Sequence, residues 1–142
     1  MTAQQRDPLA RRLRAAIELQ PEIGALRTLL LGIGGVEFVA SSQIDPDIGA
    51  LISSGFAMED LVECEPMERS ACHANVARLW VADKSDLLGI GTGYALSDDG
   101  LWRQHSWGMR RNGILETTKP RVRYFGIALQ GRDADAFAAL NG

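Results

Sequence analysis

The sequence predicts an α+β fold in which N-terminal helices and a cysteine-bearing helix pack on an antiparallel meander sheet. In the first half of the chain, apolar residues recur at helical spacing, whereas residues 88–129 alternate between apolar and polar or small residues. The dipeptide Asn112-Gly113 and the tripeptide Asp98-Asp99-Gly100 separate the alternating runs, as tight turns between strands do. Helices followed by a run of strands are typical of the α+β class.

The length and composition of the chain limit the kinds of protein it can be. The 142 residues are enough for a single domain, with a helical lead-in and loop over 1–69 and the cysteine helix, the sheet and a last helix over 70–142. A net charge of −3 without a Lys/Arg run predicts no nucleic-acid partner. We see neither a signal peptide nor an apolar run that could span a bilayer, so we expect a cytoplasmic protein with no membrane contact, no cofactor and free thiols. The oligomeric state stays open.

The elements before the cysteine helix are defined by their spacing and breakers. We expect helices over residues 8–19 and 22–31, a loop or short strand over 32–40, and a short helix that Gly55 closes. Acidic residues then dominate residues 59–68. This segment is either a solvated loop or one rim of a cleft leading to the cysteine.

Four strands and a short helix are predicted after the cysteine helix. The strands cover residues 88–97, 101–109, 114–118 and 121–129, and the helix follows Gly131. One face of the first strand carries Gly89, Gly91, Gly93 and Ala95. A glycine face of this kind is useful where something packs very close to the strand, and we expect the preceding helix to do so.

Cys72 is the first candidate catalytic residue in the sequence. Ser70 is expected to cap a helix that has Cys72 in its first turn and that places Asn75 and Asp83 on the same stripe. The N-terminus of a helix favours negative charge, which lowers the pKa of a thiol toward reactive thiolate. The alternative is that Cys72 is a small buried hydrophobe.

His105 and Glu116 are the residues that can complete a site around this thiol. A nucleophilic thiol needs a base, and the base needs a third group to fix its tautomer. His105 lies in the second predicted strand and Glu116 in the third, so the two side chains can meet across the sheet. The alternative is an inert buried histidine that is satisfied by a carboxylate.

The order of these residues resembles that of papain-like cysteine hydrolases. The resemblance covers residues 70–129 and is carried by Ser-Ala-Cys72-His-Ala-Asn-Val, by Trp102-Arg-Gln-His105-Ser-Trp107 and by Glu116. Small bacterial members of that group include amidases, peptidases and effector deamidases. The resemblance implies a papain-like fold and a Cys72-His105-Glu116 triad that performs acyl transfer on an amide, isopeptide or carboxamide of a peptide, protein or small molecule.

One position departs from that pattern. Papain-like enzymes often place an oxyanion-hole glutamine a few residues before the cysteine, where this chain has Glu65, Pro66 and Met67. The backbone N–H of Cys72 is then one oxyanion donor. The second would be a side chain such as Gln43, Asn75 or Gln104.

Other side chains near the predicted triad are candidates for contact with substrate. His73 is expected at the rim of the site. Trp102 and Trp107 lie on opposite faces of one strand, so one is expected in the core and the other, Trp107, beside the substrate. Arg121 and Arg123 share a face and are either solvent-exposed or recognise an acidic group.

Two other classes of protein fit the same residues. The first is a zinc protein that uses Cys64, Cys72, His73 and His105, although Cys72 and His73 are adjacent and point about 100° apart on a helix. The second is a non-catalytic binding domain, such as an immunity-type protein, that uses the acidic segment and a tryptophan-lined hollow.

Overall fold

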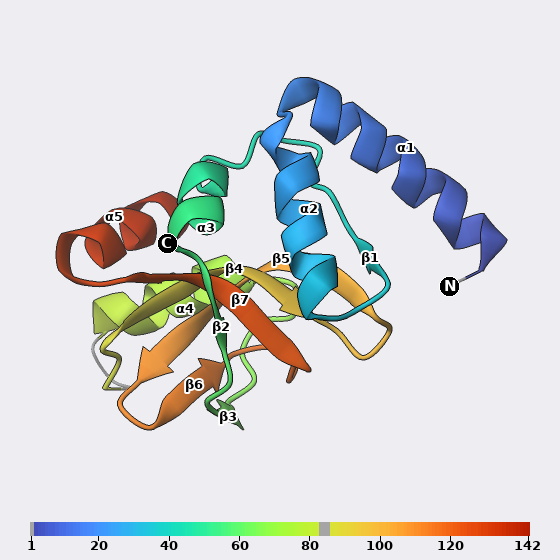
Figure 1. The fold of residues 1–142 in the computed structure, drawn as a ribbon. Coiled ribbons are helices and arrows are strands. Elements are labelled where there is room, and N and C mark those ends of the chain that lie inside the picture. The colour runs from blue at the N-terminus through green and yellow to red at the C-terminus, as the bar shows by residue number, and fades with distance from the viewer. Residues whose placement is uncertain (1, 83–85) are drawn as a thin grey trace.

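The computed structural model describes residues 2–82 and 86–142, so Asp83 lies outside the described part of the chain (Figure 1). Helices and strands alternate only loosely along the sequence. In chain order they are α1 (Ala3–Leu19), α2 (Glu22–Ile33), β1 (Glu37–Phe38), α3 (Ile48–Ser54), β2 (Phe56–Met58), β3 (Leu61–Cys64), α4 (Cys72–Ala82), β4 (Gly89–Leu96), β5 (Leu101–Arg110), β6 (Gly113–Glu116), β7 (Arg123–Leu129) and α5 (Gly131–Asn141).

The sheet is mixed, and this corrects the antiparallel meander that the sequence predicts. Strands β4, β5 and β6 do follow one another as an antiparallel meander. However, β7 does not extend it, because it returns to the other side of β4 and gives the order β2-β7-β4-β5-β6-β3. In addition, β3 pairs in parallel with β6 and β1 pairs in parallel with β5. The α+β class is confirmed.

Part of the acidic segment is strand rather than loop. Residues Leu61–Cys64 form β3 and cover the free edge of β6, where backbone groups would otherwise lack partners. The acidic side chains also have partners, since Arg110 bonds both Glu63 and Glu65 at 3.1 and 3.0 Å. The segment has no alternation of apolar and polar residues that would predict a strand, since Leu61 and Val62 are adjacent and apolar, and both are solvent-exposed.

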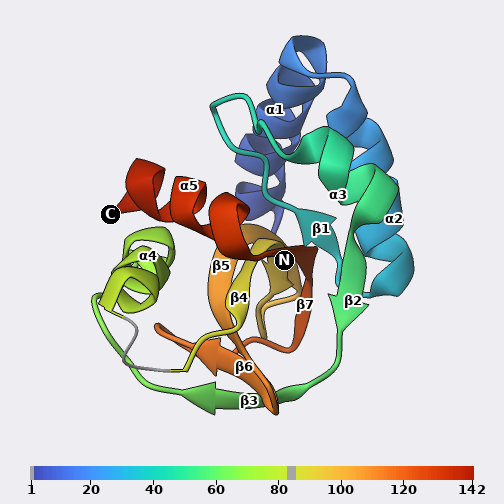
Figure 2. The same cartoon turned by 90° about the vertical axis from the view of Figure 1, so that its left-hand side faces the viewer.

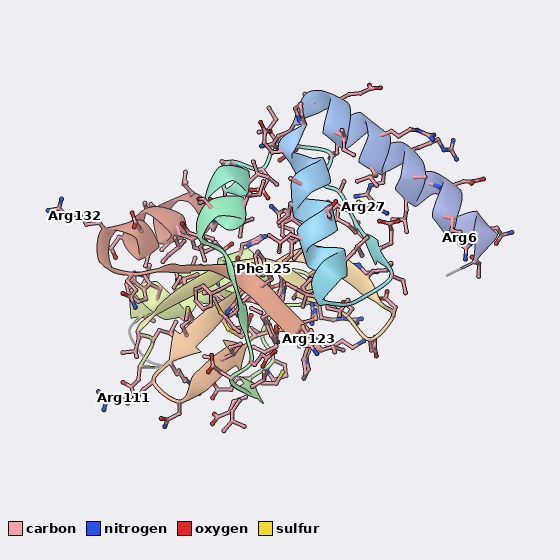
Figure 3. The ribbon with its side chains drawn as sticks, viewed as in Figure 1. Arg6, Arg27, Arg111, Arg123, Phe125 and Arg132 are labelled. Carbon is pink, nitrogen blue, oxygen red and sulfur yellow. The ribbon has the colours of Figure 1, made fainter. Side chains whose placement is uncertain are left out.

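Two groups of helices flank the strands. Helices α1, α2 and α3 gather at one end, while α4 and α5 lie side by side at the other (Figure 2). The first group packs on Tyr94, Trp102 and Phe125, and Phe125 lies on β7 close to α2 and α3 (Figure 3). A smaller cluster contains Trp107 and Tyr124. Helix α4 also packs against β5, and its first residue, Cys72, lines the same cleft as His105 of that strand.

At Gly91, the glycine face of β4 packs against a tryptophan and not against the preceding helix, which the sequence predicts there. Gly91 and Trp107 are cross-strand partners in the β4–β5 ladder. A Cβ atom on Gly91 would overlap the indole of Trp107, which is fully buried. The small residue on β4 thus makes room for the large one opposite.

We expect Gly91→Ala to lower the free energy of unfolding by about 1–3 kcal/mol, because the added methyl forces a buried indole out of its place. Gly24→Ala is the matched control. Gly24 lies in α2 with open space around its Cα, so the same change there should raise stability by about 0.5–1 kcal/mol. Urea denaturation of both variants measures the difference, and equal effects would contradict this account of the β4 face.

Candidate active site

His105 and Glu116 form a buried pair between β5 and β6. The Nε2 atom of His105 lies 2.8 Å from Oε1 of Glu116, and the two side chains are 3% and 0% exposed. Because these strands are neighbours in the sheet, two residues that are eleven positions apart in sequence meet after a single turn. The sheet therefore holds the imidazole and the carboxylate in a fixed line.

Four donors surround the Glu116 carboxylate. Oε1 accepts hydrogen bonds from His105 and from the Tyr124 hydroxyl at 2.7 Å, and Oε2 accepts from the N–H and the hydroxyl of Thr118, both at 2.9 Å. Burial alone would raise the pKa of Glu116, but these bonds outweigh it and lower the pKa to about 2. The group is therefore a satisfied carboxylate at neutral pH.

The imidazole of His105 is enclosed on the carboxylate side and open toward the thiol. Its ring stacks on Trp107 and tilts against Tyr124, with centroids 6.1 and 6.2 Å away. Nε2 is used by Glu116, so Nδ1 is the nitrogen that remains for Cys72. Burial would lower the pKa of His105, but hydrogen bonds and charge from Cys72 and Glu116 raise it above its ordinary value.

Cys72 is the first residue of α4, and its thiol is only partly buried. Burial would raise the pKa of this thiol, but hydrogen bonds and charge from His105 and His73 outweigh it and lower the pKa to about 5. The unpaired N–H groups at the start of a helix also favour a thiolate. Between pH 5 and the raised pKa of His105, the pair is a thiolate beside an imidazolium.

The turn into α4 differs from the serine cap that the sequence predicts. The N–H of Asn75 donates to the carbonyl of Ala71 at 2.8 Å, which places Ala71 and not Ser70 at the cap position. Ser70 instead adopts a left-handed backbone with φ of 57°, and this sharp turn brings the chain into the helix. Asn75 is buried, and its amide donates to the carbonyl of Glu68 at 2.8 Å, so it fixes the loop before Cys72.

A second hydrogen-bonded chain reaches the thiol, and the sequence interpretation missed it. Nδ1 of His73 lies 2.6 Å from the hydroxyl of Ser106, which lies 2.8 Å from the hydroxyl of Thr92. Both hydroxyls are buried and belong to cross-strand partners in β4 and β5. The available signal was two polar residues inside apolar strands, where buried polar groups need partners.

Ser106→Ala is expected to raise the pKa of Cys72 by less than His105→Ala does, because it frees the ring of His73 but leaves the main base in place. Stability should fall by about 1 kcal/mol through the lost hydrogen bonds. The pH dependence of Cys72 alkylation and urea denaturation measure the two effects. An unchanged pKa would mean that His73 does not depend on Ser106 for its position.

An open cleft of about 730 Å³ leads to the thiol. Cys72, His73, Gln104 and His105 all line it, so of the amide side chains suggested as a second oxyanion donor, Gln104 lies at the cleft of the thiol, whereas Gln43 lines only a neighbouring hollow. Trp107 is fully buried and does not line the cleft. Trp102 is also buried, and its indole N–H donates to the carbonyl of Gly34 at 2.9 Å. The two tryptophans are therefore core residues.

Neither a metal site nor a membrane-spanning helix is found among the described residues. Within 2–82 and 86–142, no three His, Cys, Asp or Glu side chains are placed to hold a metal ion together. In the same ranges, no helix combines the length and apolarity needed to cross a bilayer. Comparisons of the chain with protein-family models, curated proteins and solved structures found no match.

Proposed function

We propose that this chain is a cysteine hydrolase or acyl transferase of the papain-like type, acting on an amide, isopeptide or carboxamide through Cys72, His105 and Glu116. One observation carries the proposal. A partly exposed thiol with a pKa of about 5, a buried imidazole and a buried carboxylate follow one another at the end of a cleft. Perturbed titration of linked groups in a cleft is what nucleophilic catalysis requires.

The first half of the reaction forms an acyl-enzyme. The thiolate of Cys72 attacks the carbonyl carbon, and a C–S bond forms while the carbonyl becomes an oxyanion. The oxyanion accepts hydrogen bonds from the backbone N–H of Cys72, at the helix N-terminus, and from Gln104. The carbonyl then re-forms, the bond to the leaving group breaks, and the imidazolium of His105 gives that group its proton.

The second half releases the acyl group. Neutral His105 takes a proton from water or another acceptor nucleophile, whose oxygen or nitrogen attacks the thioester carbon. The C–S bond breaks and the thiolate returns beside a protonated His105. Glu116 keeps the ring oriented through Nε2 in both halves, which leaves Nδ1 on the side of the sulfur throughout.

The activated ester p-nitrophenyl acetate tests the proposal without knowledge of the natural substrate. We expect a burst of close to one nitrophenolate per chain, with the acetyl group found on Cys72 by mass spectrometry. Cys72→Ala should abolish the burst and Cys64→Ala should keep it. If Cys72 is never acetylated although its thiol titrates near pH 5, the site does not perform acyl transfer.

The features that suggested a non-catalytic binding domain are a tryptophan-lined hollow and a free acidic segment, and the structure supports neither. Its hollow was to be lined by Trp102 and Trp107, and both are buried. Its acidic segment is partly neutralised, since Arg110 bonds Glu63 and Glu65. A binding surface alone also gives no reason for a thiol pKa of about 5.

A further inference from the structure

The cleft at Cys72 is strongly cationic although the chain as a whole is acidic. Arg69, Arg103, Lys119 and Arg121 line it together with two histidines. Among the described residues, no aspartate or glutamate lines the same cleft. The whole chain has a net charge of −3, so this concentration of positive charge is local to the site.

In the part of the chain that the structure describes, three of these four cations have no acidic partner that neutralises them. Arg103 is paired with Asp99 at 2.8 Å. By contrast, Arg69, Lys119 and Arg121 form no ion pair within residues 2–82 and 86–142, whereas Arg123, two positions beyond Arg121, bonds Glu59 at 3.1 Å. A guanidinium with no acid beside it is the usual recognition group for a carboxylate or phosphate.

Arg121 is held at the cleft by its own loop. Its guanidinium donates to the carbonyl of Lys119 and to the hydroxyl of Thr118, and its backbone N–H donates to the hydroxyl of Tyr124 at 3.3 Å. Thr118 and Tyr124 also bond the carboxylate of Glu116. One short loop thus fixes the third member of the triad and a cation that faces the cleft.

The hollow on the other side of His73 and Gln104 has a different character. Its volume is about 540 Å³, and it is lined by Asp47, Asp133 and the apolar side chain of Phe137, with no lysine or arginine among its described residues. The two hollows share His73 and Gln104. The charge therefore differs between the cationic cleft at Cys72 and the neighbouring hollow, which has no cations among its described residues.

We propose that the substrate carries a carboxylate or phosphate beside its scissile acyl group, and that this oxyanion is bound by Arg69, Lys119 and Arg121. The proposal deepens the proposed function and depends on it, because it assumes that a substrate is acylated onto Cys72. The anion enters from the cationic side of the cleft, and the neutral or amine-bearing part of the molecule lies toward Asp47 and Asp133.

Two alkylating agents that differ in charge test this directly. Iodoacetate carries a carboxylate one carbon from the reacting atom, whereas iodoacetamide is neutral and of nearly the same size. We expect the rate ratio of iodoacetate to iodoacetamide at Cys72 to exceed the ratio for glutathione by at least about threefold in low salt, and to fall as ionic strength rises. The Cys64→Ala background ensures that only Cys72 is measured.

Charge-removing variants locate the effect. Arg121→Gln, Arg69→Gln and Lys119→Gln should each lower the iodoacetate-to-iodoacetamide ratio about two- to threefold, and the exposed Arg69 and Lys119 give this test even if Arg121→Gln does not fold. Arg132→Gln is the matched control, since Arg132 projects from α5 into solvent (Figure 3) and does not line the cleft. That variant should keep the wild-type ratio.

The outcomes separate this proposal from the proposed function. A ratio equal to that of glutathione, or one that falls equally in Arg132→Gln, overturns the anionic substrate even if p-nitrophenyl acetate acylates Cys72. Added glutarate or inorganic phosphate identifies the oxyanion, because the better-bound anion slows alkylation by iodoacetate more. Slowing by neither anion, at concentrations that leave iodoacetamide unaffected, also counts against the proposal.

Discussion

Alkylation of Cys72 by iodoacetamide is expected to rise with a single inflection near pH 5 and to stay level through neutral pH. The thiolate is the reacting form, and hydrogen bonds and charge from His105 and His73 lower the pKa of this thiol to about 5 despite its partial burial. A thiol with the ordinary value of 9.0 is still almost fully protonated over that whole range. Rate measurements between pH 4 and 9.5, with the site identified by mass spectrometry, give the profile.

The expected size of the effect depends on two opposing terms. At pH 6 the lowered pKa makes Cys72 roughly 90% thiolate, against about 0.1% for a thiol with a pKa of 9. A less basic thiolate is also a weaker nucleophile, by roughly 60-fold over four pKa units. Cys72 should therefore react about ten- to twentyfold faster than an ordinary thiol at pH 6 and more slowly than one above about pH 7 to 8.

Two comparisons within the chain make this result specific. Cys64 is the internal control, because burial and the charge of Glu116 raise the pKa of its thiol, so it should show no inflection near pH 5. His105→Ala should move the Cys72 inflection upward toward its ordinary value of 9.0, with a faster plateau at high pH because the more basic thiolate is a better nucleophile. A wild-type inflection near pH 9, or no shift in His105→Ala, would remove the basis for nucleophilic catalysis.

The part of the fold that local patterns determine could be predicted closely. The β4–β5 hairpin follows from strict alternation on both sides of Asp98-Asp99-Gly100, and the helix α2 follows from its apolar spacing after Pro21. The pairing of His105 with Glu116 was foreseeable for the same reason. A turn at Asn112-Gly113 fixes which strands are neighbours, and neighbouring strands bring their side chains within hydrogen-bond reach.

Features that depend on distant pairing could not be predicted in this way. No local sequence pattern determines that β7 pairs with β4 and not with β6, because β4 and β6 both have a free strand edge before β7 is added. Strand β3 has exposed side chains on both faces and therefore no period. The chain from His73 through Ser106 to Thr92 joins α4 to two strands, so it appears only once the helix has been docked.

Replacement of Glu116 is expected to have the largest combined effect on stability and on the site. Glu116→Ala leaves three side chains, those of His105, Thr118 and Tyr124, without their shared acceptor in a buried place. Removing one partner of a buried, hydrogen-bonded charge typically costs about 3–5 kcal/mol in the free energy of unfolding. Because a variant with this loss can fail to fold, Glu116→Gln is the more informative change, as it keeps the volume but replaces one acceptor oxygen by a donor.

Glu116→Gln should separate the role of charge from that of packing. Without the carboxylate, one of the two groups that raise the pKa of His105 is gone, so the imidazolium beside the sulfur is less favoured and the Cys72 inflection moves upward from pH 5. Tyr124→Phe is the control, since it removes one donor to Oε1 but keeps the charge, and should cost only about 1 kcal/mol without moving the inflection. Equal shifts in both variants would show that Glu116 acts on Cys72 only through packing.

The pH dependence of stability gives an independent measure of the same carboxylate. The pKa of Glu116 is lowered from 4.5 to about 2 by His105, Tyr124 and Thr118 against the opposing effect of burial. A depressed pKa means that the folded state binds this proton less readily than the unfolded chain, so the stabilisation is complete above pH 4.5 and is lost as the pH falls toward 2. In urea denaturation, the stability difference between wild type and Glu116→Gln should therefore shrink as the pH falls below about 4.5. A difference that stays constant down to pH 2 would mean that the carboxylate is not held in its charged form, and the orientation of His105 would then need another cause.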